Sequence, residues 1–236
     1  TMVVGLNELN GIFNPLFYTT AFDNYVMGPV FSSVCILDDD NNLIDDAGNI
    51  SYKEIKDDAG NTTQVEYTVK LKDGMTFSDG KPVTIDDYIF GLYVQLDPNY
   101  DGMSTLSTLN IQGLKEYREG GEAVKEVSGI KKVDDLTATI TIDGVSIVAD
   151  RQLGLQTILP KHYYGVGDDG TEFKKGDMTV PKSRNSAPMG NGPYIFKNYE
   201  NNIVTLEANP NYFKGAPKTP NLKFQVVAEA NKVDVV

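Results

Sequence analysis

The sequence has very few of the residues that most often carry metal and redox chemistry. Its 236 residues include one cysteine, one histidine and no tryptophan. A single cysteine excludes a disulfide framework and a structural zinc cluster, and a single histidine excludes a metal site built from several histidines. Cys35 lies between Val34 and Ile36, so we interpret it as a small buried hydrophobic side chain.

Basic side chains are also scarce, at 21 against 33 acidic ones, which gives a formal net charge of -12. A chain this acidic would repel phosphate backbones, so the composition argues against nucleic-acid binding. No apolar run reaches the roughly 18 residues that a membrane span needs. Residues 1–4 lack the pattern of a signal peptide. These features suit an exported bacterial protein and a cytosolic one equally well.

What the sequence does contain is a series of short strands separated by residues that favour turns. Residues 64–72 alternate apolar and polar side chains, which is the period of a half-buried strand. The turn-forming residues 57–61 come before this strand and predict a hairpin with residues 52–55. Further strands are predicted at 137–142, 195–196, 203–206 and 222–227.

One amphipathic helix is predicted over residues 85–96. Its apolar side chains recur at the spacing of one helical face, and Thr84 and Asp87 have the spacing of a capping box. Shorter helices are predicted near 22–34 and over 114–119. Many strands, few helices and no regular alternation between them favour an α+β fold with mixed, largely antiparallel sheets.

Acidic residues raise the question of a calcium loop or a catalytic carboxylate pair. The run at 38–42 fails the EF-hand pattern, because Leu43 and Asn49 hold its sixth and twelfth positions. We interpret it as a polar turn, with a weak surface calcium site of another geometry left open. Each carboxylate pair has a local explanation as a helix cap or as turn residues, so a glycoside hydrolase is a less favoured alternative. The pairs are 86–87, 134–135 and 168–169.

Three further features have a structural and a functional interpretation. The sequence shows no nucleophile motif and no second histidine beside His162, which argues against catalysis by this residue. Residues 190–194, Gly-Asn-Gly-Pro-Tyr, allow a tight chain crossover or a close approach of the backbone to a ligand, and the crossover is favoured. Aromatic residues crowd the segment 13–25, where they would line a cleft or fill a core.

Several segments together resemble one protein family. Residues 67–87, with the sequence YTVKLKDGMTFSDGKPVTIDD, look like the signature stretch of bacterial extracellular solute-binding proteins of the oligopeptide/dipeptide type. These proteins are the capture subunits of ABC importers. Residues 158–162 resemble the segment that closes the family's second lobe, and residues 192–213 resemble its return strand and the Asn-Pro-x-Tyr-Trp element that follows. The resemblance covers nearly the whole chain, with the segments in the family's order.

The resemblance implies two lobes of a periplasmic-binding-protein-like type II fold. The lobes are 1–37 with 180–236 for the discontinuous first lobe, and 38–179 for the inserted second lobe. Family members carry a third lobe across the ligand cleft, and residues 231–236 stand where the helix that leads to it begins, so the third lobe is absent from this chain. The chain departs from the family at Phe213, where tryptophan is usual, and at 143–157, a short segment that bears on the shape of the cleft.

The resemblance also implies ligand capture between lobes, without catalysis and without a cofactor or metal. The implied ligand is a peptide, bound through its backbone and delivered to ABC permease subunits in the membrane. Nickel chelates, sugars and opines are alternative solutes for the same fold, and a purely structural surface domain is the remaining rival. The implied protein is a monomer, lipid-anchored on the extracellular face of the membrane or periplasmic.

A few residues match ligand-contacting regions of the family. In the loop after the first strand, Glu8 would meet a cationic group of the ligand and Asn10 would hydrogen-bond to it. The resemblance further implicates Met103, Ser104, Gly190 and Asn191, the last two at the crossover between lobes. Because the family's main anchors for peptide termini lie on the third lobe, we expect this chain alone to bind peptide weakly.

Overall fold

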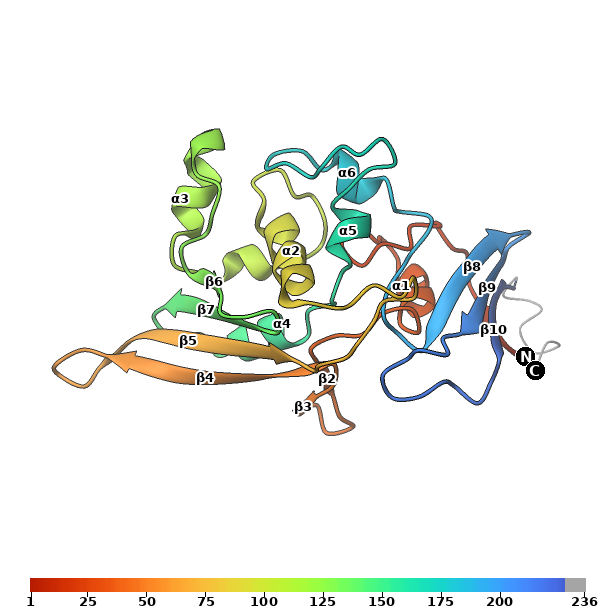
Figure 1. The fold of residues 1–236 in the computed structure, drawn as a ribbon, viewed down its shortest axis with the longest axis horizontal. Coiled ribbons are helices and arrows are strands. Elements are labelled where there is room, and N and C mark those ends of the chain that lie inside the picture. The colour runs from red at the N-terminus through yellow and green to blue at the C-terminus, as the bar shows by residue number, and fades with distance from the viewer. Residues whose placement is uncertain (228–236) are drawn as a thin grey trace.

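The structure, a computed structural model, describes residues 1–227 and contains two four-stranded sheets that lie at opposite ends of the molecule with helices between them (Figure 1). One sheet has the strand order β4 (Gly48–Lys56), β5 (Thr62–Leu71), β7 (Thr137–Asp143) and β6 (Ile130–Lys132). The other has the order β1 (Met2–Leu6), β10 (Asn221–Val226), β9 (Ile203–Ala208) and β8 (Tyr194–Glu200). Strand β1 is parallel to β10, and every other pair in the two sheets is antiparallel.

The remaining elements are short, apart from one helix. A two-stranded antiparallel ribbon consists of β2 (Cys35–Leu37) and β3 (Leu43–Asp45). The helices are α1 (Ala21–Met27), α2 (Ile85–Leu96), α3 (Leu114–Glu119), α4 (Ala149–Gly154), α5 (Lys161–Tyr164) and α6 (Thr179–Lys182). No helix within residues 1–227 is both long and apolar enough to cross a bilayer.

Strand β5 shows why the alternating pattern forms a sheet with one covered face. Its side chains at Val65, Tyr67, Val69 and Leu71 are almost completely buried, and those between them are more exposed. They pack with apolar side chains of β7, α2 and α4 in one continuous cluster, which we call the β5 core. A second cluster, the β9 core, contains Val204 and Leu206 of β9 and apolar side chains of residues 6–31.

Helix α2 lies between these two cores and contributes to both. Tyr88 and Leu92 belong to the β5 core, whereas Phe90 and Val94 belong to the β9 core. The helix begins as its capping box predicts, since the backbone N–H of Thr84 donates to the carboxylate of Asp87 at 2.8 Å. The helix is therefore apolar on a second face as well as on the one that its sequence spacing indicated, as expected of a helix buried on more than one side.

Further contacts join the part of the molecule around the β5 core to the part around the β9 core. Phe213, which follows β9, packs against the β5 core, and the neighbouring Lys214 forms an ion pair with Asp46 from the loop before β4. In the opposite direction, Leu159 and Tyr164 from the predicted second lobe belong to the β9 core. The lobe boundaries that the sequence suggests stay a prediction.

The fold class and the main elements agree with the sequence prediction. The α+β class, the largely antiparallel pairing, the helix over 85–96 and the helix over 114–119 are confirmed. The helix predicted near 22–34 is shorter, because Gly28 and Pro29 follow its last turn at Met27. The run at 38–42 is a polar turn between β2 and β3, in which the Asp38 carboxylate accepts from backbone N–H groups. Residues 231–236, where the helix to the third lobe would begin, lie outside the described residues.

Candidate functional site

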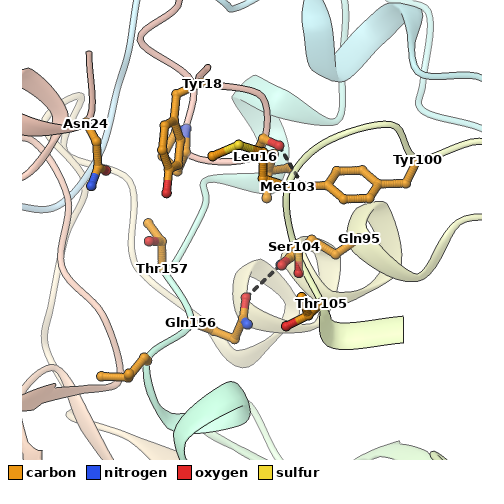
Figure 2. Close-up of a pocket in the computed structure, with 12 residues that line it drawn as sticks. Leu16, Tyr18, Asn24, Gln95, Tyr100, Met103, Ser104, Thr105, Gln156 and Thr157 are labelled. Carbon is orange, nitrogen blue, oxygen red and sulfur yellow. Dashed lines mark hydrogen bonds between the residues drawn. The ribbon is translucent and has the colours of Figure 1, made fainter. Parts of the chain in front are cut away.

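A hollow of about 430 Å³ opens where three segments of the chain meet. Figure 2 shows their side chains surrounding it: one segment precedes and enters α1, one comprises the last turn of α2 and the loop after it, and one follows α4. The first segment supplies Pro15, Leu16, Tyr18 and Asn24; the second supplies Gln95, Tyr100, Met103, Ser104 and Thr105; the third supplies Leu155, Gln156 and Thr157.

The third segment is held beside the first part of the chain by backbone pairing. The backbone N–H of Val34 donates to Gln156 O at 3.2 Å, and that of Ile158 donates to Ser32 O at 3.1 Å. Thr157 forms a bridge with Ser33 between these two bonds. This pairing places the side chains of Gln156 and Thr157 opposite residues that are more than a hundred positions earlier in the sequence.

The loop after α2 is fixed against the first segment. The Tyr100 hydroxyl donates to Leu16 O at 2.6 Å, and the Tyr100 ring lies 5.5 Å from that of Phe17. Gly102 lies so close to these groups that a Cβ atom on it would overlap Leu16 O and the Tyr100 side chain. Glycine at this position therefore permits the close approach that sets Met103 at the edge of the hollow.

Two glutamines form a connected amide pair in the wall of the hollow (Figure 2). The Gln95 amide nitrogen donates to Gly91 O at 2.9 Å and to Gln156 Oε1 at 2.6 Å. The Gln156 amide nitrogen donates to Gln152 O at 2.6 Å. Because a backbone carbonyl can only accept, these bonds fix the orientation of both amides.

The electrostatics of the hollow differ from those of the rest of the chain. None of its lining residues is an aspartate, glutamate, lysine, arginine or histidine. Burial raises the pKa of Tyr100 to about 12, so this phenol is neutral at physiological pH. The hollow therefore offers hydroxyl, amide and apolar groups to a ligand and no formal charge.

Two of the residues implicated by the sequence, Met103 and Ser104, line the hollow. Asn10 lies outside the lining but donates to Thr19 Oγ1 at 2.9 Å, which attaches its loop to the first segment. Glu8 is exposed on the same loop. Ligand contact by any of these residues stays a prediction.

Gly190 and Asn191 are buried against another part of the chain, away from the lining of the hollow. A Cβ atom on Gly190 would overlap Val30 O, and Asn191 Oδ1 accepts from the backbone N–H of Ser32 at 3.2 Å. The backbone N–H of Gly192 also donates to Val30 O. These contacts are those of a tight crossover, and a direct role of Gly190 and Asn191 in ligand binding stays a prediction.

His162 has a carboxylate partner that the sequence did not reveal. Its Nε2 atom lies 2.7 Å from Asp79 Oδ2, and its ring lies edge-on to Phe77. This pair lies outside the lining of the hollow. Within residues 1–227, no group of three or more His, Cys, Asp or Glu side chains is placed to hold a metal ion.

The acidic pairs are engaged in a helix cap, as their sequence context suggests, and in ion pairs that the sequence did not indicate. Asp86 binds Lys132 at 2.7 Å, and Asp87 caps α2 and accepts from the backbone N–H of Lys161 at 2.8 Å. Burial raises the pKa of Asp87, although its hydrogen bonds act to lower it. Asp135 also binds Lys132, and Asp168 binds Arg184. These carboxylates cap a helix or neutralise nearby cations.

Sequence reasoning missed most of the polar lining. Gln95, Gln156 and Thr157 carry no motif, and Asn24 follows the aromatic run only as a polar residue of a short helix. Tyr18 is a lining residue that the sequence could have indicated, because it belongs to the aromatic segment 13–25. One feature of the sequence could have indicated Gln95: a glutamine on a helix, flanked by Val94 and Leu96, is expected to be buried and to need a hydrogen-bond partner inside the protein.

Comparison with known proteins defines the class of this chain. Residues 58–235 match the family model of bacterial extracellular solute-binding proteins, family 5. The chain belongs to this family. Its fold is that of the type II solute-binding proteins: an oligopeptide-binding protein from Lactococcus, solved with an endogenous peptide in the closed conformation, matches 99% of the chain at 21% identity and a TM-score of 0.76.

Two further comparisons point to one relative. The oligopeptide-binding protein AppA of Bacillus subtilis is 27% identical over 234 residues, which are 98% of this chain and 37% of AppA. The structure of AppA in complex with a nonapeptide matches 99% of this chain and 41% of AppA, at 25% identity and a TM-score of 0.72. The chain thus spans well under half the length of these relatives.

Proposed function

We propose that this chain is the N-terminal portion of the peptide-capture component of an ABC importer. Its first lobe would comprise residues 1–37 and 180–236, and its second lobe residues 38–179. The observation that carries the proposal is the match of 99% of the chain to AppA, a relative whose structure contains a bound nonapeptide. A third lobe in the rest of the protein would close over the ligand.

The hollow is suited to form part of the wall of a peptide cleft. Peptide backbones present alternating N–H donors and C=O acceptors, and amide and hydroxyl side chains can satisfy both. Ser104, Gln156 and Thr157 supply such groups at the hollow. Glu8 would meet a cationic group of the ligand, and Asn10 would add a hydrogen bond from the adjoining loop.

The proposed activity is binding and delivery, without chemical conversion of the ligand. The family is described as extracellular solute-binding, which supports a location on the outer face of the membrane by a lipid anchor, or in the periplasm. Delivery would be to membrane permease subunits, by a monomeric protein. The one histidine is bound to Asp79 and lies outside the hollow, an arrangement that gives no support to catalysis.

The test is native mass spectrometry of the full-length protein after purification under mild conditions. We expect a bound mass that fragments as a peptide, and calorimetry should then show binding of synthetic peptides. A retained nickel chelate, sugar or opine would replace the peptide in this proposal. A full-length protein that retains no solute and binds no peptide would contradict it.

The same measurement on residues 1–236 alone separates the contribution of this part. Because a large share of the cleft surface would be missing, we expect peptide binding at least about a hundredfold weaker than in the full-length protein. Equal affinity would mean that the missing part contributes nothing to the site.

A further inference from the structure

The hollow is unusual within this chain because none of its lining residues carries a charge at physiological pH. Charged residues make up 23% of the sequence, so about three would be expected among twelve lining residues. None is present. A charged group that entered the hollow would give up part of its hydration without meeting an opposite charge, which is unfavourable.

The amide pair adds a directional preference. Gln95 donates both amide hydrogens within the protein, which leaves its Oε1 as an acceptor. Gln156 donates to Gln152 O and has one further amide hydrogen without a partner among the described residues. The pair therefore offers a ligand one acceptor and one donor. An amide or hydroxyl group can use both, whereas a carboxylate can use only the donor and an ammonium group only the acceptor.

The Thr105 hydroxyl in the wall of the hollow has the same dual character. Thr105 Oγ1 accepts from the Gln152 amide at 2.7 Å and keeps its own hydrogen to donate. With a hydrogen to donate and a second lone pair to accept, this hydroxyl again favours a neutral partner that both donates and accepts.

We infer that the hollow is a specificity pocket for an uncharged, hydrogen-bonding group of the ligand, such as the side chain of Ser, Thr, Asn or Gln in a peptide. This inference rests on the proposed function and names the group that this part of the cleft takes. Aspartate, glutamate, lysine and arginine are disfavoured at the position of the peptide whose side chain enters the hollow. The selection comes from the missing counter-charge together with the fixed amide pair.

The first experiment measures this selection in the full-length protein. Calorimetry is performed with penta-alanine peptides in which each position in turn is replaced by Ser, Asn, Asp or Lys. At one position, Ser and Asn peptides should bind about tenfold more tightly than Asp and Lys peptides. Equal binding of all four peptides at every position would overturn this inference and leave peptide capture intact. Failure to bind any peptide would overturn peptide capture and the inference together.

The second experiment reverses the selection by adding one charge. Ser104 Oγ accepts from the backbone N–H of Leu106, a bond that an aspartate carboxylate can also make, so Ser104→Asp should preserve the loop. Ser146 Oγ accepts from the backbone N–H of Val148 in the same pattern and lies outside the hollow, so Ser146→Asp is the matched control.

Ser104→Asp should raise the affinity for the Lys peptide at the selective position at least about fivefold and lower that for the Asp peptide by a similar factor. Ser146→Asp should change neither. Far-UV circular dichroism and melting temperature verify that both variants are folded. An unchanged Lys-to-Asp ratio in folded Ser104→Asp, or the same change in Ser146→Asp, would overturn the inference.

Discussion

Replacing either partner of the ion pair between Asp46 and Lys214 should destabilise the protein, but by different amounts. The Asp46 side chain is 6% exposed, whereas that of Lys214 is 43% exposed. No other donor to the Asp46 carboxylate is found within residues 1–227. Removing the lysine therefore leaves a buried carboxylate without a partner, whereas removing the carboxylate leaves a lysine that can return to water.

The expected costs follow from this asymmetry. Loss of one partner from a buried ion pair costs about 3–5 kcal/mol, and Lys214→Met should cost about 3 kcal/mol because the lysine is partly exposed. Asp46→Asn keeps the volume of the side chain and should cost about 1 kcal/mol. The double variant should be close to Asp46→Asn alone, because the unpaired charge is no longer present.

Urea unfolding of the full-length protein, followed by far-UV circular dichroism, measures these differences. The three variants should have the same m value, the slope of the unfolding free energy against urea concentration, which shows that they report the same transition. This asymmetry would be contradicted if Asp46→Asn were at least as destabilising as Lys214→Met, or if the double variant showed the sum of the two single effects.

Three other predictions follow from single residues. Gly102→Ala should displace the loop at the hollow, destabilise the protein by about 1–3 kcal/mol and weaken peptide binding, whereas Gly28→Ala, where a Cβ atom has room, should do neither; urea unfolding and calorimetry distinguish them. Burial raises the pKa of Cys35 to about 11, so only about 0.1% of this thiol is ionised at pH 8; thiol labelling located by mass spectrometry should be slow in the native protein and fast in urea, and fast native labelling would contradict the burial. Burial acts to raise the pKa of Asp79, but hydrogen bonds from a backbone N–H and from His162 outweigh it, so the pKa lies below its usual value. The stabilisation is therefore present above about pH 4 and lost as the pH falls through the lowered pKa, and the stability difference between wild type and Asp79→Asn should shrink between pH 6 and pH 3; a constant difference would contradict this assignment.

The elements that the sequence predicted well are those whose information is local. The alternation in β5 and the capped stripe of α2 lie within single elements, so period and capping were enough to place them. The boundary of α1 was predicted too late, because apolar residues continue to Val34 while Gly28 and Pro29 end the helix.

The hollow could not be predicted in the same way, because its lining is assembled by distant contacts. Gln95 and Gln156 are 61 residues apart, and the segment that contains Gln156 is in turn paired with the backbone near Ser32, more than a hundred positions earlier. His162 and Asp79 are 83 residues apart, so their contact was equally invisible. Family resemblance indicated Met103 and Ser104, but it could not show that the residues around them are uncharged.

Native mass spectrometry of the gently purified full-length protein, together with calorimetry on synthetic peptides, tests peptide capture directly. If the protein captures peptides, the bound mass should give a series of fragments that differ by amino-acid residue masses, and added peptide should displace it. A full-length protein that is purified without any bound solute and shows no heat of binding with peptides would contradict peptide capture.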